Sequence, residues 1–394
     1  MIRSKIITRT VLLLSLVSLF NDISSELLYP ILPVYLQSIG FSFFMIGLLE
    51  GLAEAVAGLS KGYFGNLSDS IGKRLPFVQF GYLLSAAAKA LLAIFSTVVP
   101  VFIARTFDKL GKGVRTSARD AILSDESSVG NKAAVFGFNK SMDTIGAAIG
   151  PMLALIYLYY YPGDYKALFA IAIIPSVVAV LITFIVKEKM LQPQSSKSNI
   201  SFFSFFKYWS QATASYKIIV CGLLFFTLMN SSDVFLLLAI KQKGFSDQHM
   251  IGIYIFYNLV FALFAFPVGR LADKFGMVKM IAIGMLIFSS VYFSISFADS
   301  LILFMPIFFA YAIYAACFEG TARAIITEHC KKENTATALG FYSSFSSIMT
   351  VIASSWTGFV WMKFGSMPAF IISGSGVLLV VTYFAFNHKK IAYR

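Results

Sequence analysis

The sequence predicts an all-α membrane protein with twelve transmembrane helices in two six-helix bundles. The 394-residue chain is 58% hydrophobic and only 13% charged, whereas about 25% of a typical soluble protein is charged. Apolar runs long enough to cross about 30 Å of hydrocarbon recur along almost the whole chain. A polar stretch near the middle separates six of these runs from the other six.

Each apolar run is expected to be a helix, because a helix satisfies its own backbone groups inside lipid. The expected spans are approximately 10–37, 42–64, 76–97, 98–121, 133–160, 167–186, 217–240, 250–268, 277–297, 301–326, 336–362 and 367–387. The first run follows basic residues, as in a signal peptide, but it is too long and no small-residue cleavage site follows. We therefore expect it to remain as the first span.

Residues 187–216 interrupt the hydrophobic rhythm. They begin with the polar "KEKMLQPQSSKSN" and continue with "ISFFSFFKYWSQ", whose aromatic residues surround Lys207 as in a segment lying at the lipid headgroups. We therefore expect an N-terminal six-helix bundle at 1–186, a cytoplasmic linker with an interfacial segment at 187–216, and a C-terminal six-helix bundle at 217–394.

Lysine and arginine fall mainly in every second loop, on the side of the N-terminus. By the positive-inside rule this side is cytoplasmic, with both termini inside. The net charge of +13 is not gathered into one basic arm, so it does not indicate nucleic-acid binding. The expected partners are the lipid bilayer, a small-molecule substrate and protons, and the expected functional unit is a monomer.

The chain lacks the usual signatures of enzymes and of ATP-driven pumps. It contains no HExxH, GxSxG or GxxxxGK[ST] pattern. Its cysteines have no metal-ligand spacing, and its histidines fall at span ends or in loops. We therefore expect no catalysis, no metal and no cofactor, with a proton gradient as the driving force.

The two halves of the sequence repeat the same patterns in the same order. The matched segments are "FNDISSELL" with "MNSSDVFLL", "GNLSD" with "GRLAD", "SARDAILSDE" with "TARAIITEH", and "AAVFGFNKSMDTI" with "ATALGFYSSFSSI". Equivalent spans cross in the same direction, so the halves are expected to be parallel repeats with the transport path in the crevice between them.

Two loops carry a family motif. "GNLSDSIGKR" begins at Gly65 and "GRLADKFG" begins at Gly269, and both resemble the "GxLaDrxGrk" loop of the major facilitator superfamily. The resemblance implies this family's fold and a cytoplasmic gate. Glycines here permit close approach and a sharp turn, and Asp69 can bind either an arginine or the positive end of a neighbouring helix. The expected gate residues are Gly65, Asp69, Gly72, Arg115, Arg119, Asp273 and Arg323, with Asp69 beside Arg115 or Arg119 and Asp273 beside Arg323.

Two further segments resemble the proton-driven antiporter branch of that family. "GAAIGP" in the fifth span is similar to its "GxxxGP" motif and suggests helix bending at Gly146, Gly150 and Pro151, although Ala154 and Leu155 replace the usual glycines. Arg105 fits the fourth-span arginine motif, while Lys109 replaces a glycine. The fuller stretch "RTFDKLGKGVRTSARDAILSD" resembles bacterial facilitator proteins, so the expected location is the cytoplasmic membrane of a bacterium.

Eleven ionisable residues fall at bilayer depth. They are Asp22, Glu26, Glu50, Glu54, Asp108, Asp143, Lys89, Arg105, Lys109, Lys112 and Lys140. At about 3 kcal/mol for a charge near a helix centre, eleven of them facing lipid would cost on the order of 30 kcal/mol. Spacings of three or four place each set on one helix face, so we expect these faces to be turned toward protein or water.

These residues have two interpretations: structural ion pairs, or groups that load and release a proton. We expect Asp22, Glu26 and Glu54 to be the proton-coupling residues. The expected substrate-cavity residues are Glu50, Arg105, Asp108, Lys109, Lys112, Lys140 and Asp143, with Asn230 and Asp233 from the second repeat.

The sequence thus predicts a secondary active transporter that moves a small charged or zwitterionic solute by alternating access. The fifth-span glycines favour proton-coupled export. Proton-coupled uptake of a polar nutrient, an uncoupled facilitator and a channel remain as alternatives.

Overall fold

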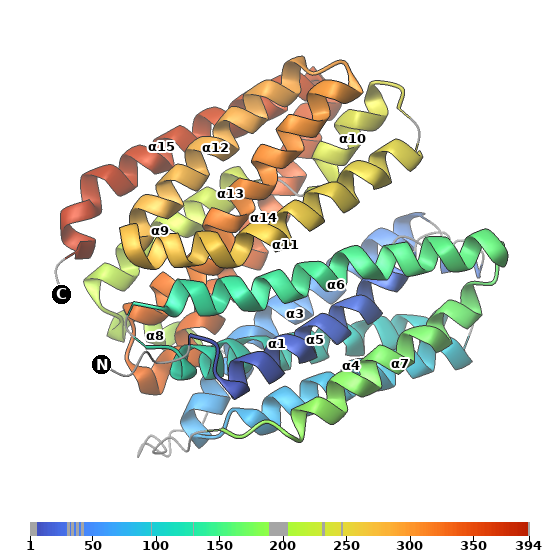
Figure 1. Ribbon diagram of the computed structural model, residues 1–394, viewed down its shortest axis with the longest axis horizontal. Helices are drawn as coiled ribbons and strands as arrows, with labels where there is room; N and C mark the ends of the chain where they lie inside the picture. The colour runs from blue at the N-terminus through green and yellow to red at the C-terminus, as the bar shows by residue number, and fades with distance from the viewer. Residues whose placement is uncertain are drawn as a thin grey trace. The chain divides into compact units, whose positions relative to one another are not determined.

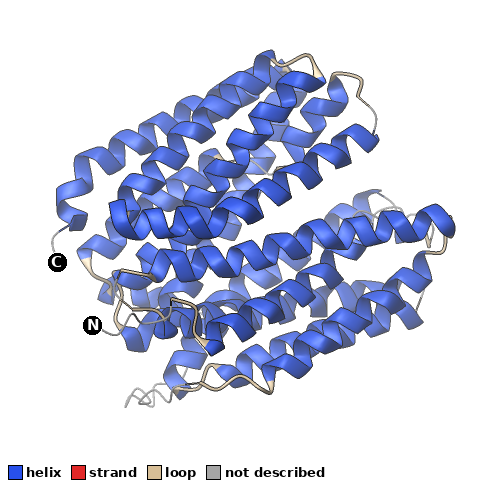
Figure 2. Ribbon diagram, in the orientation of Figure 1, coloured by secondary structure: helices blue, strands red, loops and turns tan. Residues whose placement is uncertain are grey.

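A computed structural model describes residues 6–29, 32, 35–36, 39–40, 43–95, 97–128, 130–188, 204–230, 233–245 and 247–392. Every secondary-structure element in this part of the chain is helical (Figures 1 and 2). The polar part of the predicted linker, residues 189–203, lies outside the described residues.

The elements follow the predicted spans in order. The first six spans correspond to α1 (Arg9–Leu28), α3 (Phe43–Ile71), α4 (Leu75–Ile94), α5 (Val98–Glu126), α6 (Lys132–Tyr160) and α7 (Tyr165–Thr183). Two short helices follow, η1 (Ser204–Lys207) and α8 (Tyr208–Gln211). The last six spans correspond to α9 (Ala214–Met229) with α10 (Val234–Gln242), α11 (Asp247–Phe275), α12 (Met277–Phe297), α13 (Leu301–Glu328), α14 (Thr335–Phe364) and α15 (Ser366–Ala392), with η2 (Lys332–Asn334) before α14.

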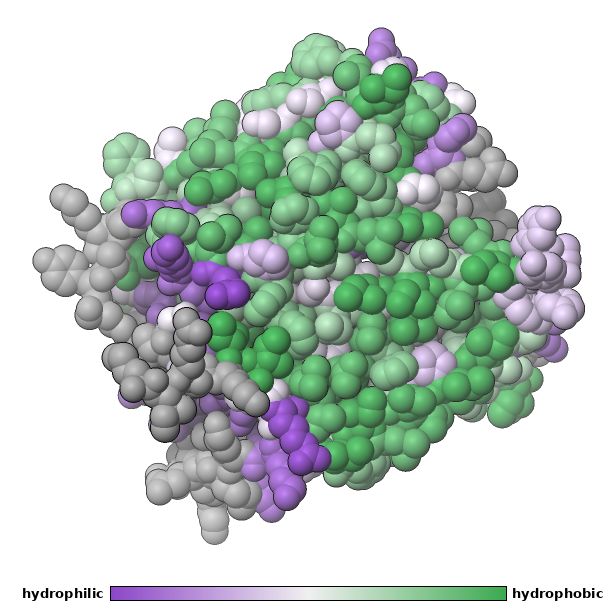
Figure 3. All heavy atoms as spheres, in the orientation of Figure 1, coloured by the Kyte–Doolittle hydropathy of each residue, from purple (hydrophilic) through white to green (hydrophobic). Residues whose placement is uncertain are grey.

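Within the described residues, nine helices are long and apolar enough to cross a membrane by length and composition alone. Outside this set are α3 and α5, which carry many charged residues, and the interrupted pair α9 and α10. Figure 3 shows that most side chains on the visible face are hydrophobic. Large apolar side chains such as Ile302 and Phe386 are more than four-fifths exposed, as expected for residues that contact lipid.

The seventh predicted span is not one continuous helix, so that prediction is wrong. Helix α9 ends at Met229, Asn230 has an extended backbone (φ −94°, ψ 104°), and α10 begins after Asp233. The side chains of Asn, Ser and Asp compete with helical hydrogen bonds and favour helix ends. The polar run from Asn230 to Asp233 therefore interrupts the span near its middle.

The chain divides into two compact units. Unit 1 comprises residues 1–127, 142–210 and 331–344, and unit 2 comprises residues 128–141, 211–330 and 345–394. Two long helices are divided between the units. The beginning of α14 belongs to unit 1 and its remainder to unit 2, whereas the beginning of α6 belongs to unit 2 and its remainder to unit 1. The predicted bundles at 1–186 and 217–394 stay a prediction.

In unit 1, α5 packs on α3 and α4, while α7 packs on α1 and α4. The α4–α5 contact is close because glycines face each other: a Cβ on Gly81 would lie 2.7 Å from the carbonyl oxygen of Gly111. The predicted interfacial segment also packs here. Phe205 is fully buried against α3 at Gly62, and Trp209 stacks on Phe341, whereas Phe206 is exposed.

In unit 2, α13 packs on α11 and α12, and α15 packs on α9 and α12. Its core is aromatic: Phe226, Phe288, Tyr292 and Tyr314 are all at most 4% exposed. The Phe288 ring stacks on Tyr292 and meets Tyr314 edge to face, arrangements that add to the stability gained from burial.

Candidate substrate and proton site

Helix α5 carries the charged face of unit 1. Asp108 pairs with Arg105 at 3.3 Å, and Lys109 forms an ion pair with Glu54 of α3. Lys89 of α4 is 1% exposed and interacts electrostatically with Asp108. Two pairs of the predicted charged residues, Arg105 with Asp108 and Lys109 with Glu54, therefore contact each other.

Lys89 also donates hydrogen bonds to two hydroxyls, Ser25 at 3.1 Å and Ser176 at 3.0 Å. These serines belong to α1 and α7, and Ser176 also lies 3.0 Å from Ser24. A polar connection thus joins α1, α4 and α7 behind the charged face of α5.

A pair of acidic residues links α1 and α6. Asp22 accepts a hydrogen bond from Asn21 at 3.0 Å and interacts electrostatically with Asp143. Asp143 is 7% exposed. One of its carboxylate oxygens is buried and has no hydrogen-bond partner among the described residues, since Arg119 lies 3.9 Å away.

Two glycines allow α1 and α6 to approach this closely. A Cβ on Gly146 would lie 2.6 Å from the carbonyl oxygen of Leu19 and 3.0 Å from the Cβ of Asp22. A Cβ on Gly150 would lie 2.7 Å from the backbone nitrogen of Leu27. Helix α6 continues through Pro151, and the predicted bending role of this segment stays a prediction.

The predicted residues of the fifth span separate. Asp143 faces Asp22 in unit 1, whereas Lys140, three residues earlier, lies in unit 2 and pairs with Glu319 at 3.7 Å. Their assignment to one substrate cavity stays a prediction. Glu26 is half-buried on α1, and the side chain of Glu50 lies outside the described residues.

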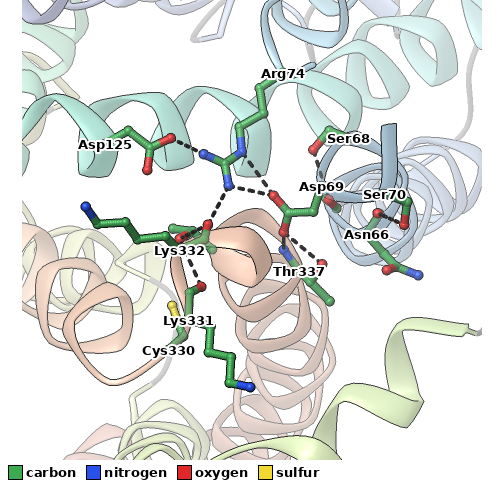
Figure 4. A network of polar contacts seen from close by, with 12 residues as sticks. Asn66, Ser68, Asp69, Ser70, Arg74, Asp125, Cys330, Lys331, Lys332 and Thr337 are labelled. Carbon is green, nitrogen blue, oxygen red and sulfur yellow. Dashed lines mark hydrogen bonds and ion pairs between the residues drawn. The ribbon is translucent and has the colours of Figure 1, made fainter. Parts of the chain in front are cut away.

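Asp69, the predicted gate residue of the first loop motif, binds Arg74 and the start of α14 (Figure 4). Its Oδ1 accepts from the Nε and Nη2 of Arg74 at 3.0 and 2.7 Å. Its Oδ2 accepts from the backbone N–H and the hydroxyl of Thr337 at 2.7 and 2.9 Å. The predicted binding to a helix N-terminus is confirmed, but Arg74 takes the place of Arg115 or Arg119.

Arg74 is fully buried and holds three further groups together. It binds Asp125 and donates to the backbone carbonyl of Lys332 at 3.0 Å, while its own N–H donates to Glu188 at 2.8 Å. Burial alone would lower the pKa of the Arg74 guanidinium and raise that of the Asp69 carboxyl. The carboxylates of Asp69 and Asp125 outweigh burial at Arg74 and raise its pKa above the usual value.

The two predicted gate arginines lie in the interior of unit 1. Arg115 donates to Ser85 at 2.6 Å and stacks over the Tyr82 ring at 4.5 Å. Arg119 binds Asp120 at 3.0 Å, with Asp143 beyond it. Both arginines therefore connect α5 to its neighbours inside the unit.

The second loop motif repeats the helix-end contact. Asp273 accepts from the backbone N–H groups of Ala133 and Ala134, at 3.0 and 2.8 Å, in the first turn of α6. The predicted partner of Asp273 was Arg323, and the structure shows these two backbone N–H groups as its partners instead. In both motifs the expected roles of glycine are confirmed: a Cβ on Gly65 or Gly269 would lie 2.4 Å from a backbone oxygen, and Gly72 has a positive φ of 71°.

The interrupted span carries the polar groups of unit 2. Asp233 is exposed and accepts a hydrogen bond from the hydroxyl of Tyr311 at 2.6 Å. Asn230 donates to the hydroxyl of Tyr314 at 3.2 Å, and the rings of Tyr311 and Tyr314 lie 5.2 Å apart. Sequence reasoning missed these tyrosines because aromatic residues are abundant and none stands out by spacing.

The part of the chain that the structure describes contains no group of three or more His, Cys, Asp or Glu side chains that could hold a metal ion.

Nine helices long and apolar enough to cross a membrane among the described residues, together with ion pairs and acidic groups within the long helices, indicate a membrane transport protein. The chain belongs to the Major Facilitator Superfamily, whose family model matches residues 14–261 and 247–391. It is an integral multi-pass membrane protein and a secondary transporter rather than an enzyme.

Three similar proteins illustrate the range of the family. An uncharacterized MFS-type transporter, MJ1317 of Methanocaldococcus jannaschii, is 31% identical over 387 residues, which are 95% of each chain. Citrate exporter 1 of Aspergillus niger is 22% identical over 190 residues, 48% of this chain and 36% of that protein. The crystal structure of the human organic anion transporter MFSD10 superposes with a TM-score of 0.81 at 16% identity, covering 95% of this chain and 99% of that one.

Proposed function

We propose that this protein is a proton-coupled exporter of a small charged or zwitterionic solute, working by alternating access. The observation that carries the proposal is the pair Asp22 and Asp143, with one buried carboxylate oxygen that lacks a hydrogen-bond donor among the described residues. Two neighbouring carboxyls that share one proton satisfy such an oxygen and relieve the repulsion between like charges. Loss and gain of that proton would couple transport to the pH gradient.

The surroundings of the pair support this role. Asp22 and Glu54 both interact electrostatically with Lys112, so a proton taken up on α1 changes the charge that α5 experiences. Glu54 is engaged with Lys109, and proton exchange there would have to break this ion pair. We therefore place the proton first on Asp22 and its partner Asp143, with Glu26 and Glu54 as further candidates.

Export is favoured by the fifth-span glycines, which pack against α1 beside Asp22, and by the similarity to a citrate exporter. The distribution of basic loops favours cytoplasmic termini in the cytoplasmic membrane of a bacterium. We propose that the loop aspartates Asp69 and Asp273 act as cytoplasmic latches that release during transport, since each binds the first turn of a long helix. The functional unit is proposed to be the monomer.

The test is transport by purified protein in proteoliposomes under an imposed pH gradient. Asp22→Asn is expected to abolish gradient-driven transport while sparing exchange of labelled solute between compartments, because exchange needs no net proton movement. Asp299→Asn, at an exposed loop carboxylate, is the matched control. Unchanged coupling in Asp22→Asn, Asp143→Asn and Glu54→Gln would show that the proton role is wrong.

A second candidate function is proton-coupled uptake of a polar nutrient, favoured by the mixed charges along α5. The two functions differ in the sign of the gradient. Export by exchange requires an acidic compartment on the side toward which solute moves, whereas symport carries solute away from the acidic side.

A further inference from the structure

Lys112 occupies the midpoint of α5, fourteen residues from Val98 at one end and fourteen from Glu126 at the other. At 1.5 Å per residue its Cα lies about 21 Å from each end of the helix. A charge at such depth costs about 3 kcal/mol when it faces lipid. Yet the Lys112 side chain is exposed in the structure, so the surface to which it is exposed determines its role.

The two neighbouring glycines fix the direction of Lys112. A Cβ on Gly111 would lie 2.8 Å from the hydroxyl of Ser85, so residue 111 faces α4. A Cβ on Gly113 would lie 2.5 Å from the Cβ of Ser60, so residue 113 faces α3. Successive residues of a helix are about 100° apart. Lys112 therefore projects between these two contacts, on the side of α5 that neither α3 nor α4 covers.

Two acidic groups identify that side as the protein interior. Lys112 interacts electrostatically with Glu54 of α3 and Asp22 of α1, as well as with Lys109 and Arg115. Neither acid lies within ion-pair distance of it in the described part of the chain. Lys112 thus lies on a side of α5 from which it interacts with acidic residues of α1 and α3 within unit 1.

The other basic residues of this face already have partners. Arg105 binds Asp108, Lys109 binds Glu54, Arg115 binds Ser85 and Arg119 binds Asp120. No hydrogen bond or ion pair of the Lys112 ammonium is found among the residues that the structure describes. An ammonium at this depth that makes no ion pair with a described side chain is available to bind a ligand.

We propose that Lys112 binds the oxyanion, a carboxylate or phosphate, of the transported solute. The inference rests on the proposed transport function and names the substrate class: a small organic or inorganic anion. Lysine serves as a compact point charge with three donors, which suits an oxygen-rich anion. Asp22 and Glu54 interact with Lys112 electrostatically but form no ion pair with it among the described residues, so neither carboxylate occupies its ammonium.

Labelling of the intact purified protein tests the inference without a transport assay. The probe is trinitrobenzenesulfonate, which reacts with accessible neutral amines, and peptide mass spectrometry follows the reaction at Lys112. Millimolar citrate and inorganic phosphate, added separately, are expected to slow labelling of Lys112 by about tenfold. A slowing of this size corresponds to an anion bound at about nine in ten of the protein molecules. Choline chloride at the same ionic strength should not slow it, and labelling of the exposed Lys166 serves as the internal control.

Variants supply the second arm. Lys112→Gln is expected to reduce citrate- or phosphate-driven counterflow in proteoliposomes by about tenfold or more, the effect of losing a charged hydrogen bond. Lys112→Arg should restore part of the loss, and Lys166→Gln should have no effect.

The outcomes separate the two proposals. Absence of protection by both anions overturns the assignment of Lys112, even if pH-driven transport is intact. Protection by just one of the two anions supports the assignment and identifies whether the site accepts a carboxylate or a phosphate. Protection without pH-driven transport overturns the coupling mechanism and leaves the anion site standing.

Discussion

The carboxylate of Asp69 accepts hydrogen bonds from both the backbone N–H and the hydroxyl of Thr337, while its other oxygen binds Arg74. One side chain from the first loop motif thus serves as the cap of α14. A capping group normally precedes the helix by one residue. Here it comes from a position 268 residues away.

Replacement of Asp69 by Asn is expected to lower the free energy of unfolding by about 3 kcal/mol, because it leaves Arg74 buried with one carboxylate fewer. Thr337→Val removes only the hydroxyl, and about 1 kcal/mol should be lost. Thermal unfolding in detergent measures both, with Asp299→Asn as the control. If Asp69→Asn unfolds like the wild type, the contact does not stabilise the structure described here.

Gly65→Ala and Gly269→Ala are each expected to destabilise the protein by about 1–3 kcal/mol, since the added methyl would overlap a backbone oxygen that cannot move away freely. Gly252→Ala in α11 is the matched control, because nothing lies within 4 Å of a Cβ at that position. That variant should be neutral or slightly stabilised. Equal melting temperatures for all three would contradict the close helix approach at the two loop motifs.

If the proposal that the two carboxyls share one proton is correct, Asp143→Asn is expected to impair pH-gradient-driven transport as severely as Asp22→Asn. The double variant should be no worse than either single variant, whereas independent proton sites would give additive losses. The measurement is the stoichiometry of proton to solute, from a pH-sensitive dye trapped inside proteoliposomes. Additive losses would assign the proton to separate residues.

A double-mutant cycle on Lys109 and Glu54 is expected to give a coupling free energy of about 1 kcal/mol in thermal unfolding. The value is modest because the Glu54 side chain is 45% exposed, and water screens an exposed ion pair. Lys109→Met should therefore lower the free energy of unfolding more in the wild-type protein than in the Glu54→Gln variant, by about this amount. A coupling indistinguishable from zero would mean that water already separates the two groups.

The twelve spans follow from the sequence because hydropathy is a property of each segment by itself. That Asp22, Glu54 and Lys109 interact with other ionisable side chains also follows, since an unpartnered charge facing lipid is too costly. The helix-end contact of Asp69 was predictable from the loop motif for an electrostatic reason. A carboxylate in a loop favours the positive N-terminal end of a nearby helix.

The specific partners could not be predicted, because they depend on which helix faces meet. Arg74 lies only five residues after Asp69, but it was not predicted as the partner because its burial depends on Asp125 and Lys332, which are distant in sequence. The pairing of Asp22 with Asp143 depends on the α1–α6 approach at Gly146. The break after Met229 was not predicted because the segments on its two sides are apolar. Their mean hydropathy together is still high enough for one continuous span.

The interruption between α9 and α10 has a consequence for hydration. At each helix end the outermost peptide groups lack a partner within the helix, and in hydrocarbon each such group costs several kcal/mol. Among the described residues, the N–H of Asn230 donates to the carbonyl of Phe226, and the carbonyl of Asp233 accepts from the N–H groups of Leu236 and Leu237. A helix end inside the membrane is stable only where its remaining peptide groups find polar partners or water. In the repeat with fewer charges, the main chain itself thus adds polar groups near the middle of the first span.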